Sequence, residues 1–260
     1  MSTLDLRKEA AKSPLVVPGL SALAESDLLA ARHNWRERMV SEHASARVFS
    51  ALVGQAMHAG LARREVYELT RMAREELDHG LLCARALVAL GGDAVAELPD
   101  LEPIPAHGDA EPLEALLRNV LSVSCASETI AVALVATERE QAGPLPIRRV
   151  LDQILKDEVG HARFGWRLLA KYAPAMPRSV RDRLSEYLVD VFEHQIAFHS
   201  PFLAMPCAST EGIAVGAPHG RSSWLVFVET IRGVVIPGLE RHGLRAEEAW
   251  QSVTGETLAA

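Results

Sequence analysis

Apolar residues recur along most of this chain at intervals of three, four and seven positions, which is the period of a helix that buries one face. Four long stretches in the first two thirds of the sequence show the pattern, and glycine or proline interrupts the sequence between them. The pattern predicts helices over residues 27–59, 62–90, 112–140 and 146–172. Ser26 is the expected N-cap of the first helix.

Residues 93–111 separate the second and third predicted helices and contain three prolines, so we expect no helix there. Extended residues cover about 3.3 Å each, so this linker can run the length of a bundle and start the third helix parallel to the second. The other connections are short turns, which make consecutive helices antiparallel neighbours. The pattern therefore predicts a four-helix bundle with one long crossover between helices 2 and 3.

The pattern is less regular after residue 173. We expect helices over 177–198, 222–235 and 246–253, a loop over 199–220, and an extended lead before residue 27. We predict one all-α domain, 1–260, in which 27–172 form the bundle. Additional C-terminal helices within 175–260 would cover the bundle, build a pocket or form a homodimer interface.

Composition narrows the fold class and the partners. Only 5% of the residues are aromatic, and runs rich in Val, Ile and Thr are few, which favours an all-α protein. The net charge of −7 and the scattered basic residues argue against nucleic acid and anionic membrane surfaces as partners. The three cysteines form no CxxC, and we find no signal-peptide pattern and no uninterrupted apolar run long enough to span a membrane. We expect a cytoplasmic protein.

A small set of polar residues interrupts the apolar stripes. Glu76 and His79 form a Glu-x-x-His on the second predicted helix, and Glu158 and His161 form another on the fourth. Residues i and i+3 share a helix face, so each carboxylate and imidazole can reach one metal ion. A lone glutamate also falls on the apolar stripe of each remaining helix. Burying a carboxylate costs several kcal/mol unless it is paired or bound to metal, so these positions predict a metal site.

The two halves of the bundle repeat the same chemistry. Glu42 precedes Glu76 by 34 positions, and Glu128 precedes Glu158 by 30. Two such hairpins related by a pseudo-twofold axis would bring six side chains to one level of the core. The predicted metal-binding and catalytic residues are Glu42, Glu76, His79, Glu128, Glu158 and His161.

This arrangement resembles the ferritin-like di-iron or di-manganese carboxylate superfamily, over residues 27–172. It is similar to the rubrerythrins and the di-iron oxygenases within that superfamily. The chain lacks the CxxC rubredoxin module of full rubrerythrin, and no tyrosine lies within two helical turns of a predicted ligand, unlike a ribonucleotide reductase radical subunit. The resemblance implies a ferritin-like bundle, two iron ions, with manganese as an alternative, and O2 as co-substrate.

Residues next to the predicted ligands raise further candidates. Each ligating histidine should donate its second ring nitrogen to an acceptor, and Asp78 and Asp157 are candidates for that role. Cys83 and Cys125 lie one turn from a predicted ligand, where they either line a cavity or act as small buried apolar residues. His194 is a candidate extra ligand from the fifth predicted helix.

Three classes of function are consistent with such a site. The leading hypothesis is an O2-activating oxygenase or oxidase that acts on a small organic substrate and takes electrons from an outside donor unless the substrate supplies them. The alternatives are metal or peroxide handling, as in a ferroxidase, peroxidase or manganese catalase, and a non-enzymatic ferritin-like binding protein. The acidic balance weighs against a tRNA-modifying hydroxylase.

Overall fold

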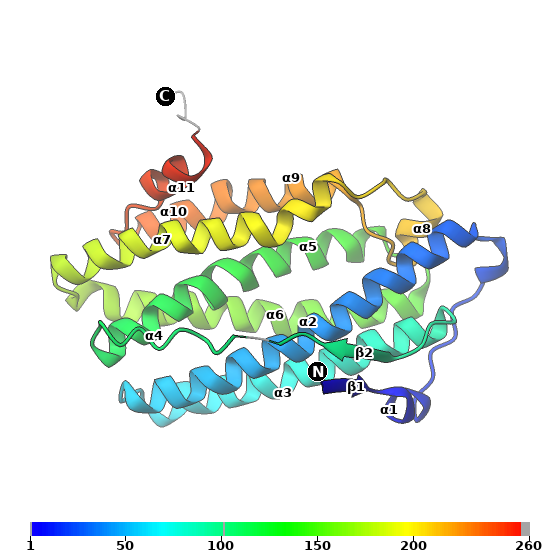
Figure 1. Cartoon of the computed structure of the whole chain (residues 1–260), viewed down its shortest axis with the longest axis horizontal. Coiled ribbons are helices and arrows are strands. Elements are labelled where there is room, and N and C mark those ends of the chain that lie inside the picture. The colour runs from blue at the N-terminus through cyan, green and yellow to red at the C-terminus, as the bar shows by residue number, and fades with distance from the viewer. Residues whose placement is uncertain (1, 101, 256–260) are drawn as a thin grey trace.

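Four long helical rods dominate the computed structural model, which describes residues 2–100 and 102–255 (Figure 1). The rods are α2 (Glu25–His58), α3 (Arg63–Ala89), the composite rod Pro112–Gln141 and α6 (Leu145–Tyr172). α2 packs along α3, and the end of the composite rod packs along α6. The predicted all-α class, with a long crossover between the second and third rods and additional C-terminal helices, is confirmed.

Glycine and proline lie at the ends of the rods where the sequence predicted them, whereas the predicted N-cap residue does not. Gly60 and Gly91 follow α2 and α3 with φ of 70° and 81°, the left-handed region that favours glycine. Pro146 lies in the first turn of α6. The predicted N-cap is wrong, because Ser26 lies inside α2 and Ala24 occupies the cap position with no side-chain hydrogen bond.

The third rod contains a change of helix type that we did not predict. α4 (Pro112–Val120) runs into a π-helical segment, Leu121–Ser127, and α5 (Glu128–Gln141) continues from it. In the π segment the Ser127 hydroxyl donates to the carbonyl oxygen of Ser122, five residues back, at 3.1 Å. The segment ends where the predicted ligand Glu128 begins α5. The apolar stripe reads similarly for either helix type, so the sequence pattern did not distinguish them.

The N-terminal lead is more ordered than we predicted. β1 (Ser2–Asp5) pairs antiparallel with β2 (Val95–Leu98), which lies in the crossover linker, and α1 (Arg7–Ala11) follows β1. Further along the linker, the Asn119 side-chain amide donates to the Pro105 carbonyl at 2.8 Å. The linker is therefore attached to the N-terminal lead by a strand pair and to α4 by the Asn119 side chain.

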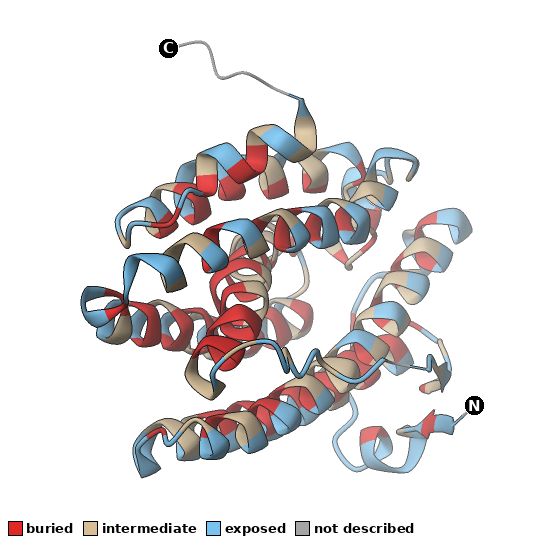
Figure 2. Ribbon diagram, turned by 60° about the vertical axis from the view of Figure 1, so that its left-hand side comes forward, coloured by how far each residue is buried: buried red, intermediate tan, exposed pale blue. Residues whose placement is uncertain are grey.

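The C-terminal part adds a layer over the third rod. It consists of α7 (Arg178–His199), a 3-10 turn (Ser200–Leu203), α8 (Thr210–Ala214), α9 (Arg221–Thr230), a π segment (Ile231–Val235), α10 (Ile236–Glu240) and α11 (Ala246–Thr254). In Figure 1 α3 lies along the bottom, α2 rises diagonally from the lower left toward α8, α5 and α6 lie in the middle, and α7, α9 and α10 lie above. The α4 part of the composite rod is buried from Glu114 to Val120, and Figure 2 shows buried, red ribbon concentrated in the interior between the helices.

Two details of this part differ from our prediction. The predicted loop over 199–220 contains α8, which is fixed to the start of α2 because Asp27 accepts hydrogen bonds from the Ser209 amide at 3.2 Å and hydroxyl at 2.6 Å. The helix that starts at Arg221 also continues past Pro237, in the first turn of α10. The preceding π segment changes the backbone pattern just ahead of this proline, which has no N–H to donate.

Two helical stretches, Pro112–Gln141 and Arg221–Glu240, have the length and apolar composition of a membrane span. This criterion uses length and composition only, and a buried core helix meets it as well. Half of the most apolar 18-residue window in the first stretch is buried within the protein, and the stretch carries the buried Glu128. Its apolar composition is therefore explained by its central position.

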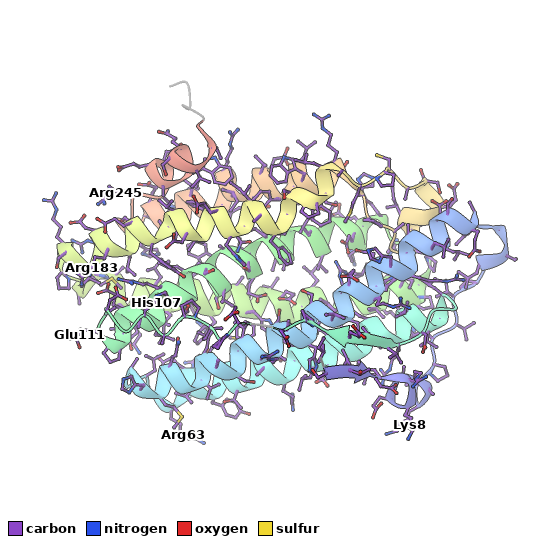
Figure 3. All side chains as sticks on the ribbon, in the orientation of Figure 1. Lys8, Arg63, His107, Glu111, Arg183 and Arg245 are labelled. Carbon is purple, nitrogen blue, oxygen red and sulfur yellow. The ribbon has the colours of Figure 1, made fainter. Side chains whose placement is uncertain are left out.

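A buried ion network closes one end of the bundle. Glu114 of α4 is 3% exposed and accepts hydrogen bonds from Arg118 at 2.8 Å and from Arg183 of α7 at 2.9 and 2.6 Å. Arg118 also donates to Asp109 of the linker at 2.9 Å. Figure 3 shows Arg183 and the linker residue His107 at this same end. The network joins the crossover linker, the third rod and the C-terminal layer.

Candidate metal centre

The structure brings the six predicted ligand residues together in the middle of the bundle. One group consists of Glu42, Glu76, His79 and Glu158, and a second of Glu76, Glu128, Glu158 and His161. Within each group, one ligand atom of every residue lies within 4.8 Å of the others. Glu76 and Glu158 belong to both groups, so the two groups are adjacent and share two carboxylates.

Each rod contributes to this cluster through a simple helical spacing. Glu76 and His79 lie one turn apart on α3, and Glu158 and His161 lie one turn apart on α6. Glu42 comes from α2, and Glu128 is the first residue of α5 after the π segment.

The polar cluster lies between two hydrophobic cores. Members of the first core that are close in sequence to the ligands are Phe49, Met72, Cys125 and Phe164. The corresponding members of the second core are Met39, Cys83, Val135 and Ile154. The Phe49 ring also meets the His161 ring edge-on, with centroids 5.3 Å apart. The apolar residues on both sides limit the access of water to the cluster.

Both imidazoles face the carboxylates through Nδ1. His161 Nδ1 lies 2.8 Å from Glu76 Oε1, 3.3 Å from Glu158 Oε2 and 3.9 Å from Glu128 Oε2. His79 Nδ1 lies 3.3 Å from Glu158 Oε1, 3.7 Å from Glu42 Oε2 and 3.9 Å from Glu76 Oε2. The two rings are 5.9 Å apart between centroids. The contacts form a nearly symmetric pattern around the shared Glu76 and Glu158.

The unpaired atoms of the cluster fit a metal pair. His79 Nδ1, His161 Nδ1, Glu76 Oε1 and Glu158 Oε2 are buried and have no hydrogen-bond partner. They approach one another closely but lack hydrogen-bond alignment, as expected of donor atoms directed at a common point between them. Four carboxylates with two neutral imidazoles would balance the charge of two divalent cations. An oxygen-rich set with two imidazoles suits iron or manganese better than structural zinc.

Ionisation of the cluster follows from burial and crowding. Burial, together with the charges of Glu158 and other neighbours, raises the pKa of the Glu76 and Glu128 carboxyls well above the usual value. Burial opposes ionisation of Glu158, but Glu128 and the two imidazoles outweigh it and hold the pKa of that carboxyl below its usual range. Burial and crowding therefore favour the protonated form of Glu76 and Glu128 in the absence of metal, and metal binding favours release of those protons.

The pKa values of the two imidazoles are raised, although burial alone would lower them. Burial lowers the pKa of His79, but the carboxylates of Glu158 and Glu42 outweigh this effect and raise it to about 11. For His161, burial is likewise outweighed by Glu158 and Glu128, and the pKa is raised to about 9. Protons on these imidazoles thus occupy the Nδ1 positions that a metal pair would take.

The outer nitrogen of each imidazole contacts an acid on the other Glu-x-x-His helix. His79 Nε2 lies 3.3 Å from Asp157 Oδ2, and His161 Nε2 lies 3.1 Å from Glu75 Oε2. The prediction for Asp157 agrees with this contact. The prediction for Asp78 is wrong, because its side chain points to solvent and Glu75 takes the role. The sequence signal for this role is the acid that immediately precedes the glutamate of each Glu-x-x-His motif, to which we had assigned no such role in the case of Glu75.

The remaining candidates lie off the cluster or are inert. His194 is exposed on α7 and stacks on Phe198, so it contributes no ligand to the cluster. Cys83 and Cys125 are fully buried, and burial raises the pKa of both thiols well above the usual value. They act as small, protonated, apolar side chains in the two hydrophobic cores.

Fold and site together define an all-α protein whose four-helix bundle contains a buried carboxylate–histidine cluster with the donor set of a metal centre. No protein-family model and no curated protein matches the sequence. Among solved structures, the fold is similar to that of a Synechococcus protein described as "Protein 19 with aldehyde deformylating oxidase activity". The TM-score is 0.60 at 20% sequence identity, over 90% of this chain and 98% of that one. This likeness extends over both the bundle and much of the C-terminal layer.

Proposed function

We propose that the protein is a dinuclear non-haem metal oxidase or oxygenase, with iron as its metal, O2 as co-substrate and a small organic molecule as substrate. The observation that carries the proposal is the pair of adjacent ligand groups sharing Glu76 and Glu158. The aldehyde deformylating oxidase activity of the structurally similar Synechococcus protein supports the same class of chemistry.

The six ligand residues would bind two metal ions in two overlapping groups. His79 and Glu42 would serve one metal, His161 and Glu128 the other, with Glu76 and Glu158 between them. Asp157 and Glu75 would hold each imidazole with Nδ1 toward the metals. When bound, a reduced metal pair supplies electrons to O2, and an outside donor restores them unless the substrate does.

The surroundings determine how small molecules reach the cluster. Of the six side chains, Glu42 is the most exposed, at 12%, whereas both histidines are at most 1% exposed. One turn before Glu42, Arg38 of α2 pairs with Glu138 of α5 at 2.7 Å. The Glu42 side is thus the face of the cluster nearest to solvent, and we place substrate entry there.

Anaerobic loading with Fe(II) followed by exposure to O2 tests the proposal. We expect the loaded wild type to consume O2 and to develop a transient visible absorption. Glu158→Ala should remain helical by circular dichroism while losing metal and O2 consumption. Asp78→Ala is the matched control, since it removes an exposed acid next to His79 and should behave like wild type. A loaded protein inert toward O2 would refute the function, and rapid H2O2 disproportionation by the Mn form would favour the catalase-like alternative.

A further inference from the structure

Ser124 lies in the π segment one helical turn before Glu128, on the side of the rod that carries this ligand. Residues four apart lie on nearly the same face of an α-helix, and also of the slightly wider π turn. On the facing helix, Gly165 stands one turn after His161. A Cβ added to Gly165 would lie 2.5 Å from the Ser124 Cβ and 3.0 Å from the Cys125 Sγ. Ser124 therefore occupies the layer of side chains next to the Glu128 and His161 layer.

The hydroxyl of Ser124 has no hydrogen-bond partner although the residue is 0% exposed. Two other buried hydroxyls on helices donate to a carbonyl of their own helix. Ser185 donates to the Arg181 carbonyl and Thr230 to the Val226 carbonyl, four residues back in each case and at 2.7 Å. An unpaired buried hydroxyl is unfavourable, so its persistence beside a metal centre calls for a partner that binds there.

The possible size of that partner is restricted by the packing. The close approach of Gly165 to Ser124 and Cys125 leaves no room for a large group between the two helices. Glu128 and His161, one helical turn from Ser124 and Gly165, belong to the ligand cluster, which itself contains buried atoms without a hydrogen-bond partner, such as His161 Nδ1 and Glu158 Oε2. The missing partner thus has the size of a small molecule that a metal ion can hold, such as water, O2 or a small anion.

We propose that Ser124 is a positioning residue whose hydroxyl donates a hydrogen bond to the small exogenous ligand held by the metal pair. Water or O2 would then bind on the side of the cluster that faces the π segment and Gly165. The inference rests on the proposed metal pair, and it adds the face on which the pair takes its exogenous ligand. Ser124→Ala removes only the hydroxyl and fits the same space.

Azide binding to the iron-loaded, air-oxidised protein tests this role without turnover. Azide on ferric iron gives a visible charge-transfer band, so its affinity can be titrated directly. We expect Ser124→Ala to retain its metal content and to bind azide about 2- to 10-fold more weakly, which corresponds to the loss of one hydrogen bond, with a shifted band. Ser124→Cys keeps a weak hydrogen-bond donor, so its azide affinity should lie between those of the wild type and Ser124→Ala. Ser185→Ala, a buried hydroxyl on α7, is the matched control and should leave azide affinity unchanged.

Thermal unfolding of the metal-free proteins separates positioning from a structural role. Ser124→Ala should unfold at or above the wild-type midpoint, because an unpaired hydroxyl is removed, whereas Ser185→Ala should unfold lower because its hydrogen bond is lost. Wild-type azide affinity in Ser124→Ala, a destabilised metal-free Ser124→Ala, or an oxidised wild type without any azide band would each overturn the inference. These outcomes would not affect the proposed function if the wild type still consumed O2. Failure of the wild type to bind metal would refute both the proposed function and the role of Ser124.

Discussion

Removing the charge of the two acids that contact the outer nitrogens of the imidazoles should weaken metal binding to different extents. Glu75→Gln and Asp157→Asn keep the shape of each side chain and remove its negative charge. Glu75 lies 3.1 Å from His161 Nε2, and its side chain is 11% exposed. Asp157 lies 3.3 Å from His79 Nε2, is 14% exposed and also accepts a hydrogen bond from Gln153 at 2.6 Å. The shorter and more buried contact should contribute more, so Glu75→Gln should be the more damaging change.

The size of the effect follows from the role of such acids. An acceptor behind a metal-bound imidazole fixes the ring and raises its basicity, and its loss typically weakens metal binding about 10- to 100-fold. That range corresponds to about 1.4–2.7 kcal/mol of binding free energy. Glu75 is also held by Arg71 at 2.5 Å, so the neutral glutamine would leave this guanidinium without its counter-charge. We therefore expect Glu75→Gln to weaken metal binding by nearly the upper value of this range and Asp157→Asn by nearly the lower value.

Competition with a chromophoric chelator measures these affinities for Fe(II) or Mn(II) directly. Asp78→Asn is the control, because this exposed acid precedes His79 directly and makes no contact with either imidazole. The reasoning would be refuted if Glu75→Gln bound metal as tightly as wild type. It would also be refuted if Asp78→Asn lost as much affinity as the two inner variants.

Three further predictions concern the scaffold. His199 is 5% exposed, and burial followed by nearby His194 lowers its pKa from 6.5 to about 4. Since the unfolded chain binds a proton at His199 more readily than the folded protein does, the free energy of unfolding falls as the pH drops from 6.5 toward 4. The loss is about 2 kcal/mol at pH 5. Unfolding midpoints of wild type and His199→Phe should therefore converge on acidification, and parallel pH profiles would contradict this. Glu114→Gln should lower the free energy of unfolding in urea by about 3 kcal/mol, since it removes the buried negative charge that Arg118 and Arg183 share. A loss below about 1 kcal/mol would show that the pairs contribute no more than surface ion pairs do. Gly165→Ala should cost about 1–3 kcal/mol by overpacking against the π segment, a cost that an unchanged thermal midpoint would exclude.

Much of the fold could be predicted from the sequence because the helical period is sustained over long stretches. Stripes of apolar residues indicate both a helix and its buried face, and a carboxylate on such a stripe needs a partner. The positions of Glu42 and Glu128 on their stripes were therefore informative, and the structure places both in the cluster. The long proline-containing linker likewise indicated the crossover.

The features that the sequence did not indicate depend on contacts between distant segments. The π segment before Glu128 leaves no clear mark on the apolar pattern. The pairing of β1 with β2 joins the N-terminal lead to the crossover linker, and α8 is fixed by Asp27 at the start of α2. The role of Glu75 likewise depends on a contact between helices, since its partner His161 lies on α6. Cytoplasmic location, a homodimer and the absence of nucleic-acid and membrane partners stay predictions.

The central claim is a dinuclear centre in which Glu76 and Glu158 stand between two metal ions. Anomalous diffraction at the iron absorption edge, from crystals grown with Fe(II) under anaerobic conditions, tests it most directly. The account predicts two peaks inside the bundle, one for each of the two ligand groups, with Glu76 and Glu158 contacting both. A single peak at full occupancy, or peaks confined to the protein surface, would contradict it.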